Sequence, residues 1–277
     1  MDNVNPEAVF SCKEEADLYL EELDRVQFHT KYNFLKAHNG FRKGNMHTFL
    51  GTSGGGKSTL TRSLMIDMFQ NFSHKEDKIL LWLSEERSKD YIAQLHKTGM
   101  PFELINRIIV YSEVDENGKN RKDVIKRLDW IISEHKPMAV FYDNITTSME
   151  YATVTIPEQD KFYHRLKTLA LNSDIPFLIM AHTNGKITEN YEHLIDQNDI
   201  RGSKQPAMIS EFFYILQAFY VNEVRHNTIR LTKFRGSSVE HRLYMLDYKK
   251  EMQLFVTDRK LEFEGFKEIF KTRNTLK

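Results

Sequence analysis

A short glycine-rich stretch carries the residue types that bind a polyphosphate. Residues 51–58 read G-T-S-G-G-G-K-S, which has the spacing G-x-x-x-x-G-K-S of a phosphate-binding P-loop. Glycines let successive backbone N–H groups converge on phosphate oxygens, where larger side chains would clash. Lys57 reaches the β- and γ-phosphates in such a loop, and the Ser58 hydroxyl can ligate Mg²⁺. The sequence therefore predicts a site for a nucleoside triphosphate such as ATP, with Mg²⁺, formed by Gly51, Ser53, Gly54, Gly55, Gly56, Lys57, Ser58 and Thr59.

The residues on either side supply the strand and the helix that position such a loop. Residues 46–50 are short and largely apolar, as in a buried strand. After the loop, Leu60, Leu64, Met65 and Met68 recur at helical spacing. This strand–loop–helix context distinguishes a P-loop from a glycine-rich loop that matches by chance.

Three more side chains with the right chemistry follow predicted apolar strands. Asp143 comes directly after residues 138–142, where an acidic group organises Mg²⁺ in P-loop enzymes. Glu85 follows residues 79–83 and is the candidate for positioning or deprotonating the attacking water, with Glu86 as the alternative. His182 ends a third such strand, where a polar group can contact the γ-phosphate and report its loss to the following loop. Ligands of open α/β sheets bind at the carboxyl ends of strands, so these residues should lie together.

The rest of the chain predicts an α/β fold. Apolar runs alternate with amphipathic segments, which implies βαβ units and a parallel sheet. The strands are expected at 79–83, 108–111, 138–142 and 177–181, and the helices at 88–97, 122–135 and 158–173. After residue 205, four strands with short turns are expected at 212–219, 227–234, 242–248 and 252–256, as an antiparallel extension of the same sheet.

Composition favours a cytoplasmic protein. The residue pattern divides the chain into an N-terminal arm, an ATPase domain and a C-terminal tail. The 277 residues include 39 basic and 39 acidic ones, a single cysteine (Cys12), no apolar run of about 18 residues and no secretory signal. An acidic amphipathic helix at about 13–28 lies in an N-terminal arm (1–30), which either packs on its own domain or docks on a neighbouring subunit. The ATPase domain is expected at 31–256. A tail at 257–277 either binds nucleic acid or forms a simple terminal helix.

Several motifs together resemble the RecA-like core of hexameric replicative helicases of the DnaB type, in a short stand-alone form such as phages and plasmids encode. The resemblance covers roughly residues 30–256. Its motifs are G-F-R-K-G at 40–44, S-E-E at 84–86, His182 where many members have glutamine and others histidine, D-I-R-G-S at 199–203, and K-F-R-G at 233–236. The last is similar to the family's K-x-R-x-G element, an arginine finger that reaches a neighbour's nucleotide. Lys204 departs from the family, which usually has glycine there.

The resemblance implies a RecA-like P-loop ATPase that works as a ring. Lys233 and Arg235, two apart on a predicted strand, would point the same way toward the neighbour's nucleotide, so activity would require a homo-oligomer. Single-stranded DNA would thread the ring and contact the loops at 145–157 and 185–204. The residues expected at this contact are Lys186, Arg201, Gly202 and Lys204.

The expected function is therefore an ATP-dependent DNA helicase. Its expected role in replication, with a loader or primase as optional partners, is what this resemblance implies. A RecA-like ATPase that is no motor, such as a recombinase, a recombination mediator or a signalling ATPase, remains the alternative. A third alternative is a scaffold that binds nucleotide without turnover.

Overall fold

The computed structural model describes residues 30–38, 40–71, 73–114, 123–184, 194–221, 224–234 and 242–261. The predicted arm helix at 13–28, Lys186, Arg235 and the tail beyond residue 261 lie outside these ranges. Among the described helices, none combines the length and the apolar character needed to cross a membrane.

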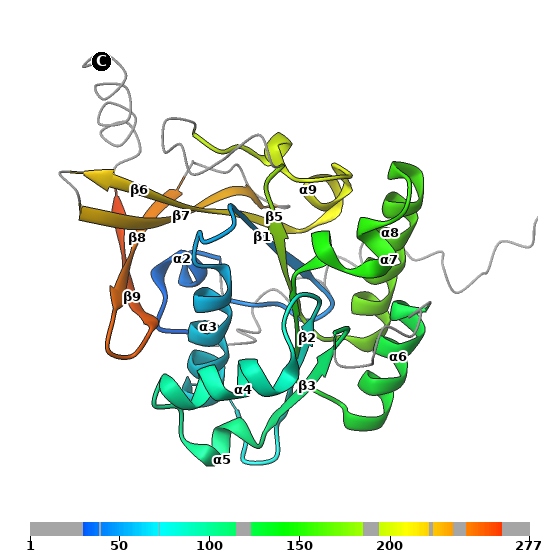
Figure 1. Ribbon diagram of the computed structural model, residues 1–277, viewed down its shortest axis with the longest axis horizontal. Helices are drawn as coiled ribbons and strands as arrows, with labels where there is room; N and C mark the ends of the chain where they lie inside the picture. Colours follow the sequence, from blue (N-terminus) through cyan, green and yellow to red (C-terminus); the bar gives the residue numbers. More distant parts are fainter. Residues whose placement is uncertain are drawn as a thin grey trace, which may run out of the picture.

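One mixed sheet organises the described residues, with the strand order β3-β2-β4-β5-β1-β6-β7-β8-β9 (Figure 1). Neighbouring strands from β3 to β6 are parallel, and those from β6 to β9 are antiparallel. The strands are β1 Met46–Gly51, β2 Ile79–Leu83, β3 Ile108–Ser112, β4 Ala139–Asp143, β5 Phe177–His182, β6 Phe212–Val221, β7 Val224–Phe234, β8 Arg242–Lys249 and β9 Leu254–Leu261. The predicted α/β fold, a parallel core extended by antiparallel C-terminal strands, is confirmed.

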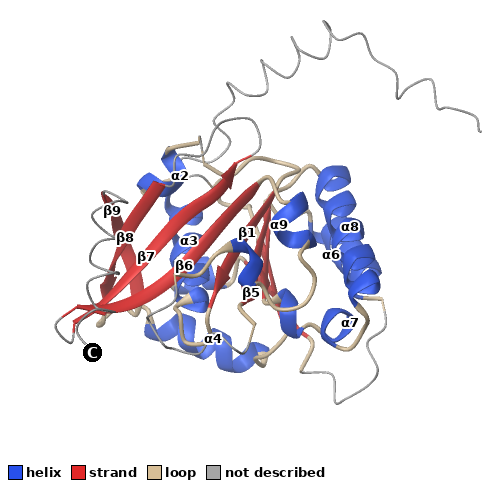
Figure 2. Ribbon diagram, turned by 90° about the horizontal axis from the view of Figure 1, so that it is seen from above, coloured by secondary structure: helices blue, strands red, loops and turns tan. Residues whose placement is uncertain are grey.

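Helices cover both faces of the sheet (Figure 2). Helices α3 and α4 pack with one buried cluster, and α6 and α8 with the other. The helices are α2 Asn33–Lys36, α3 Lys57–Asn71, α4 Ser88–Lys97, α5 Phe102–Ile105, α6 Val124–His135, α7 Met149–Ala152, α8 Ile156–Ser173 and α9 Gln205–Ile209, with 3-10 turns η2 Ile145–Thr147 and η3 Gln197–Asp199.

The structure differs from the prediction mainly after β4. The stretch 145–157, expected as a loop, contains η2, α7 and the start of α8. Thr155 and Glu158 form a capping box, which satisfies free N–H groups and starts α8 at Ile156. At the C-terminal end, β9 continues to Leu261, beyond the predicted strand end at Val256.

Two histidines are buried at the amino end of the parallel strands. The ring of His47, on β1, stacks on Phe212 with 4.3 Å between centroids, and neither of its nitrogens has a hydrogen-bond partner in the described part of the chain. His38 lies beside it, and its Nε2 is 2.5 Å from the Tyr214 hydroxyl. Burial lowers the pKa of His47 well below its ordinary value and that of His38 to about 3, and the nearby charge of Arg42 adds to both shifts. Both rings are therefore neutral in the folded protein at neutral pH.

Acid should destabilise the fold through these two rings. Free histidine titrates near 6.5, so below about that pH the unfolded chain binds more protons than the folded one and the free energy of unfolding falls. Each ring contributes about 1.4 kcal/mol per pH unit, until the folded state itself is protonated. Urea unfolding should be measured at several pH values below about 6.5. In His47→Phe the slope of the free energy of unfolding against pH should lose about half of the contribution assigned to the two histidines. His135→Gln, at an exposed histidine, serves as control, and an unchanged slope in His47→Phe would contradict the assignment.

Candidate active site

Strand register brings the predicted chemical residues to one edge of the sheet. Gly51 pairs with His182 across β1 and β5, and the Thr183 N–H donates to the Gly51 carbonyl at 3.2 Å. Leu83 pairs with Asp143 across β2 and β4, so the residues after β2 start beside that carboxylate. The carboxyl ends of the four central parallel strands therefore meet where α/β sheets bind their ligands.

A pocket opens at this edge. It is lined by Ser53, Gly54, Gly56, Lys57, Ser58, Thr59, Glu85, Asp143, Asn144 and His182. Gly51 and Gly55 are not among the lining residues, although both belong to the loop. At Gly55 a Cβ would lie 2.9 Å from the Thr52 carbonyl oxygen, and at Gly56 the backbone has φ +97° with the Phe255 ring close by. Side chains at these two positions would force the loop apart, which explains the glycines.

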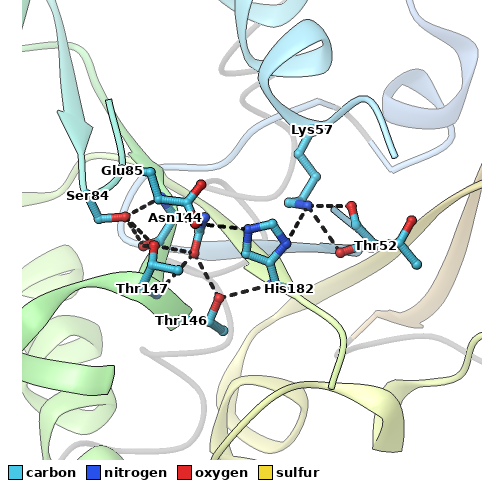
Figure 3. A network of polar contacts seen from close by, with 9 residues as sticks. Thr52, Lys57, Ser84, Glu85, Asn144, Thr146, Thr147 and His182 are labelled. Atoms are coloured by element: carbon cyan, nitrogen blue, oxygen red, sulfur yellow. Dashed lines mark hydrogen bonds and ion pairs between the residues drawn. The ribbon is translucent and has the colours of Figure 1, made fainter. Parts of the chain in front are cut away.

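Lys57 is buried at the start of α3 and points across the pocket. Its Nζ donates to the carbonyls of Gly51 at 3.1 Å and Thr52 at 2.7 Å, and it lies 2.9 Å from Nδ1 of His182 (Figure 3). Burial lowers the pKa of Lys57 to about 8, against the opposing charges of Asp143 and Glu85. A phosphate that entered here would offer the ammonium stronger acceptors than neutral carbonyls do.

His182 connects Lys57 to Glu85. Its Nε2 lies 3.3 Å from Oε1 of Glu85, on the side of the ring opposite to Lys57. Because an ammonium only donates, Nδ1 accepts from Lys57, and we assign the ring proton to Nε2 on this hydrogen-bond pattern. The hydrogen bond from His182 lowers the pKa of Glu85 to about 2, despite partial burial, and Asn144 and Thr147 act in the same direction. Glu85 is thus a firmly ionised carboxylate.

Glu86 has a different environment. It does not line the pocket, and its Oε2 lies 3.4 Å from Nε2 of Gln94 on α4. Burial raises the pKa of Glu86, and the negative charge of Asp143 adds to the effect. Of the two candidates after β2, Glu85 is therefore the one that faces the pocket.

Asp143 and Ser58 form a donor set that fits Mg²⁺. Asp143 is buried, and burial raises the pKa of its carboxyl, while a hydrogen bond from Ser58 and the charge of Lys57 oppose the rise. Mg²⁺ prefers oxygen ligands and is usually held by one or two carboxylates together with substrate phosphates. A carboxylate and a hydroxyl already in contact at the P-loop meet that requirement. The described residues contain no group of three or more His, Cys, Asp and Glu side chains placed to hold a metal ion by themselves.

A shell of small polar residues around the pocket was not predicted. The Ser84 hydroxyl donates to the Asn144 carbonyl at 2.7 Å and lies 2.6 Å from the Thr147 hydroxyl. The Thr146 hydroxyl accepts a hydrogen bond from the backbone N–H of His182 at 3.1 Å. These contacts fix the chain after Asp143 against the ends of β2 and β5. The only sequence signal for them is their position next to Glu85 and Asp143.

The segment at residues 200–202, which follows β5 and includes Arg201, lies beside the pocket. The backbone N–H of Arg201 donates to the backbone carbonyl of His182 at 2.9 Å, and Thr183 pairs with Ile200 in an antiparallel bridge. Arg201 itself is exposed. Gly202 has φ +84°, and a Cβ there would lie 2.6 Å from Oε1 of Gln159 on α8. The segment is therefore packed against α8 and bonded to the pocket histidine.

Lys204 and Lys233 both contact backbone carbonyls of their own chain. The Lys204 Nζ donates to the carbonyls of Asn198 and, at 3.2 Å, Ile200. The Lys233 Nζ donates to the carbonyls of Ala207, at 2.8 Å, and Met208, near the end of α9. Neither side chain lines the pocket.

Lys233 also lies far from its own P-loop. Gly51 pairs with Leu216 and Leu216 with Ile229, so Lys233 is four residues farther along β7, about 13 Å toward the amino edge of β1. Its predicted role on a neighbour's nucleotide stays a prediction, and so does that of Arg235.

Comparison with known proteins adds no assignment. No family model matches this chain, and no curated protein matches it. The site is therefore interpreted from its own geometry.

Proposed function

We propose that this chain is an ATP-dependent DNA helicase with a RecA-like ATPase domain, which assembles into a ring and moves on single-stranded DNA. The observation that carries the proposal is the convergence of Lys57, Ser58, Asp143, Glu85 and His182 on one pocket. These groups match the parts of a P-loop NTPase: a phosphate-binding lysine, two magnesium ligands and polar groups beside the attacking water. When bound, Mg²⁺ would neutralise charge on the phosphates.

The same pocket is joined to the segment expected to contact DNA. His182 faces Lys57 with its ring and holds the Arg201 N–H with its carbonyl. A movement of the β5 end on loss of the γ-phosphate would therefore reach the backbone at Arg201 through this hydrogen bond. Such a link supports a motor, in which hydrolysis displaces a DNA contact.

The position of Lys233 supports action between subunits. Lys233 lies toward the opposite edge of the sheet from its own P-loop, and its ammonium is bound to carbonyls of α9 and not directed into that pocket. In a ring built from repeated head-to-tail contacts, one subunit's pocket faces another surface of its neighbour. The proposal assigns that surface to the region around Lys233 and Arg235.

The test combines assembly with activity. With ATP, Mg²⁺ and a single strand, we expect closed rings in negative-stain images, ATP hydrolysis stimulated by the strand, and unwinding of a forked duplex. Filaments without unwinding would favour a non-motor RecA-like ATPase. Binding of ATP with no turnover would favour a scaffold and overturn the proposal.

A further inference from the structure

We infer that Arg225, on β7, is a further nucleotide-binding residue that contacts the polyphosphate beside the P-loop. This inference rests on the proposed function in one respect, the presence of a nucleoside triphosphate in the pocket. It adds a positive charge that comes from the same chain as the pocket, unlike the predicted arginine finger of a neighbouring subunit. None of the sequence motifs gives Arg225 a role.

The first step of the argument is the length of the β6–β7 pair, which extends beyond the carboxyl end of β1. Gly51 pairs with Leu216 on β6, and Tyr220 lies four residues farther along that strand, about 13 Å past the level of Gly51. Arg225 pairs with Tyr220 across β6 and β7. The sheet therefore carries Arg225 to the level of the P-loop, which follows Gly51.

The second step is the direction of the guanidinium, which contacts the P-loop. Its Nη2 donates to the Gly54 carbonyl at 2.8 Å, and its Nε donates to Oδ1 of Asn227 at 3.1 Å. Asn227 is buried and so fixes one side of the guanidinium, whereas Arg225 itself is exposed. Gly54 is one of the residues that line the pocket, and Arg225 is not. Arg225 therefore lies next to the pocket and is bonded to its wall.

The third step is charge. None of the carboxylates in the described part of the chain forms an ion pair with Arg225, and its two contacts are neutral oxygens. The ammonium of Lys57 likewise donates to two other carbonyls of the same loop. Arginine binds phosphate through parallel N–H groups, and such charged hydrogen bonds are about twice as strong as neutral ones. A phosphate chain is therefore a better acceptor for Arg225 than the Gly54 carbonyl. Exposed side chains change rotamer rapidly, so the exchange needs no movement of β7.

A purely structural role for Arg225 would be to brace the P-loop through the Gly54 carbonyl. The two roles need different properties of the side chain. A brace needs a hydrogen-bond donor, whereas a phosphate ligand needs a positive charge. Glutamine supplies a donor without the charge, and lysine supplies both without the planar fork of arginine. Replacement of Arg225 by each residue therefore separates the two roles.

The experiment measures binding by calorimetry for two ligands, a non-hydrolysable ATP analogue and inorganic tripolyphosphate, each with Mg²⁺. In Arg225→Gln we expect both Kd values to rise by about 5–20-fold, between the effect of an exposed ion pair and that of a shielded charged hydrogen bond. Arg225→Lys should recover most of the affinity, because it keeps the charge. The difference between wild type and Arg225→Gln should shrink as the salt concentration rises.

Arg259→Gln, at an exposed arginine on β9, is the matched control and should bind both ligands like wild type. Thermal unfolding checks the fold of each variant.

Three results would overturn the inference alone. They are wild-type affinity in Arg225→Gln, equal losses in Arg225→Gln and Arg225→Lys, or a loss for the ATP analogue with none for tripolyphosphate, which would assign Arg225 to the base or ribose. Wild-type protein that binds both ligands but unwinds no duplex would remove the proposed motor function and leave the inference in place. Wild-type protein that binds neither ligand would overturn both.

Discussion

Replacement of Lys57 by alanine is expected to eliminate ATP hydrolysis while leaving the fold intact. In the structure the ammonium crosses the pocket to His182 and is held by carbonyls at the start of the P-loop. Removing one donor that is preorganised for transition-state charge typically lowers kcat by about 10²–10³-fold. Lys57 should cost at least that much, because the same group also binds the ground-state phosphates. Steady-state ATPase and fluorescent-nucleotide binding measure the two effects separately.

The control for Lys57→Ala is Lys75→Ala, at an exposed lysine in the turn before β2. It removes the same charge at a distance from the pocket and should retain wild-type kcat. Thermal unfolding of both variants checks the fold. Hydrolysis by Lys57→Ala at more than about a tenth of the wild-type rate would show that the pocket does not carry the activity.

Replacement of Arg235 by alanine is expected to lower strand-stimulated kcat by about 10³–10⁵-fold, the usual contribution of an arginine finger. The chain should still bind ATP, because the variant retains every residue that lines the P-loop pocket. Arg259→Ala, at an exposed arginine on β9, is the control for loss of a surface charge.

Mixing two inactive variants tests whether this finger acts between subunits. A subunit with Arg235→Ala keeps a complete pocket, and one with Lys57→Ala keeps a complete finger. In randomly mixed rings about a quarter of the interfaces would join those two intact halves. ATPase activity above that of either variant alone is therefore expected. If the mixture gains no activity, the finger does not act in trans.

Local pattern was sufficient for much of the fold. The strand at Ile79–Leu83 and the helix at Ser88–Lys97 agree with the prediction to the residue, because each has a clear apolar pattern and polar flanks. All the predicted P-loop residues except Gly51 and Gly55 line the pocket, since the spacing of the motif fixes a strand–loop–helix unit. The location of the pocket at the carboxyl ends of the strands followed from the parallel arrangement of the sheet.

Other features depend on contacts between distant parts of the chain. Whether Glu85 or Glu86 faces the pocket depends on their contacts with His182 and Gln94, which lie on other elements. Nothing near Lys233 in sequence indicates that its ammonium binds the carbonyls at the end of α9. The position of the His182 ring between Lys57 and Glu85 likewise depends on the register of β1 and β5. Sequence periodicity reports neighbours along one element and carries no information on such pairs.

The backbone bond from Thr183 to the Gly51 carbonyl has a consequence for product release. It ties the carboxyl ends of β1 and β5 together beside the pocket, so in the proposed ATPase these two strands would not separate to release ADP. ADP would then leave through the outer mouth of the pocket, which in the proposed ring would be covered by the adjoining protomer. Release of ADP would then depend on opening of the interface between protomers, and this opening would limit the turnover rate of the ring.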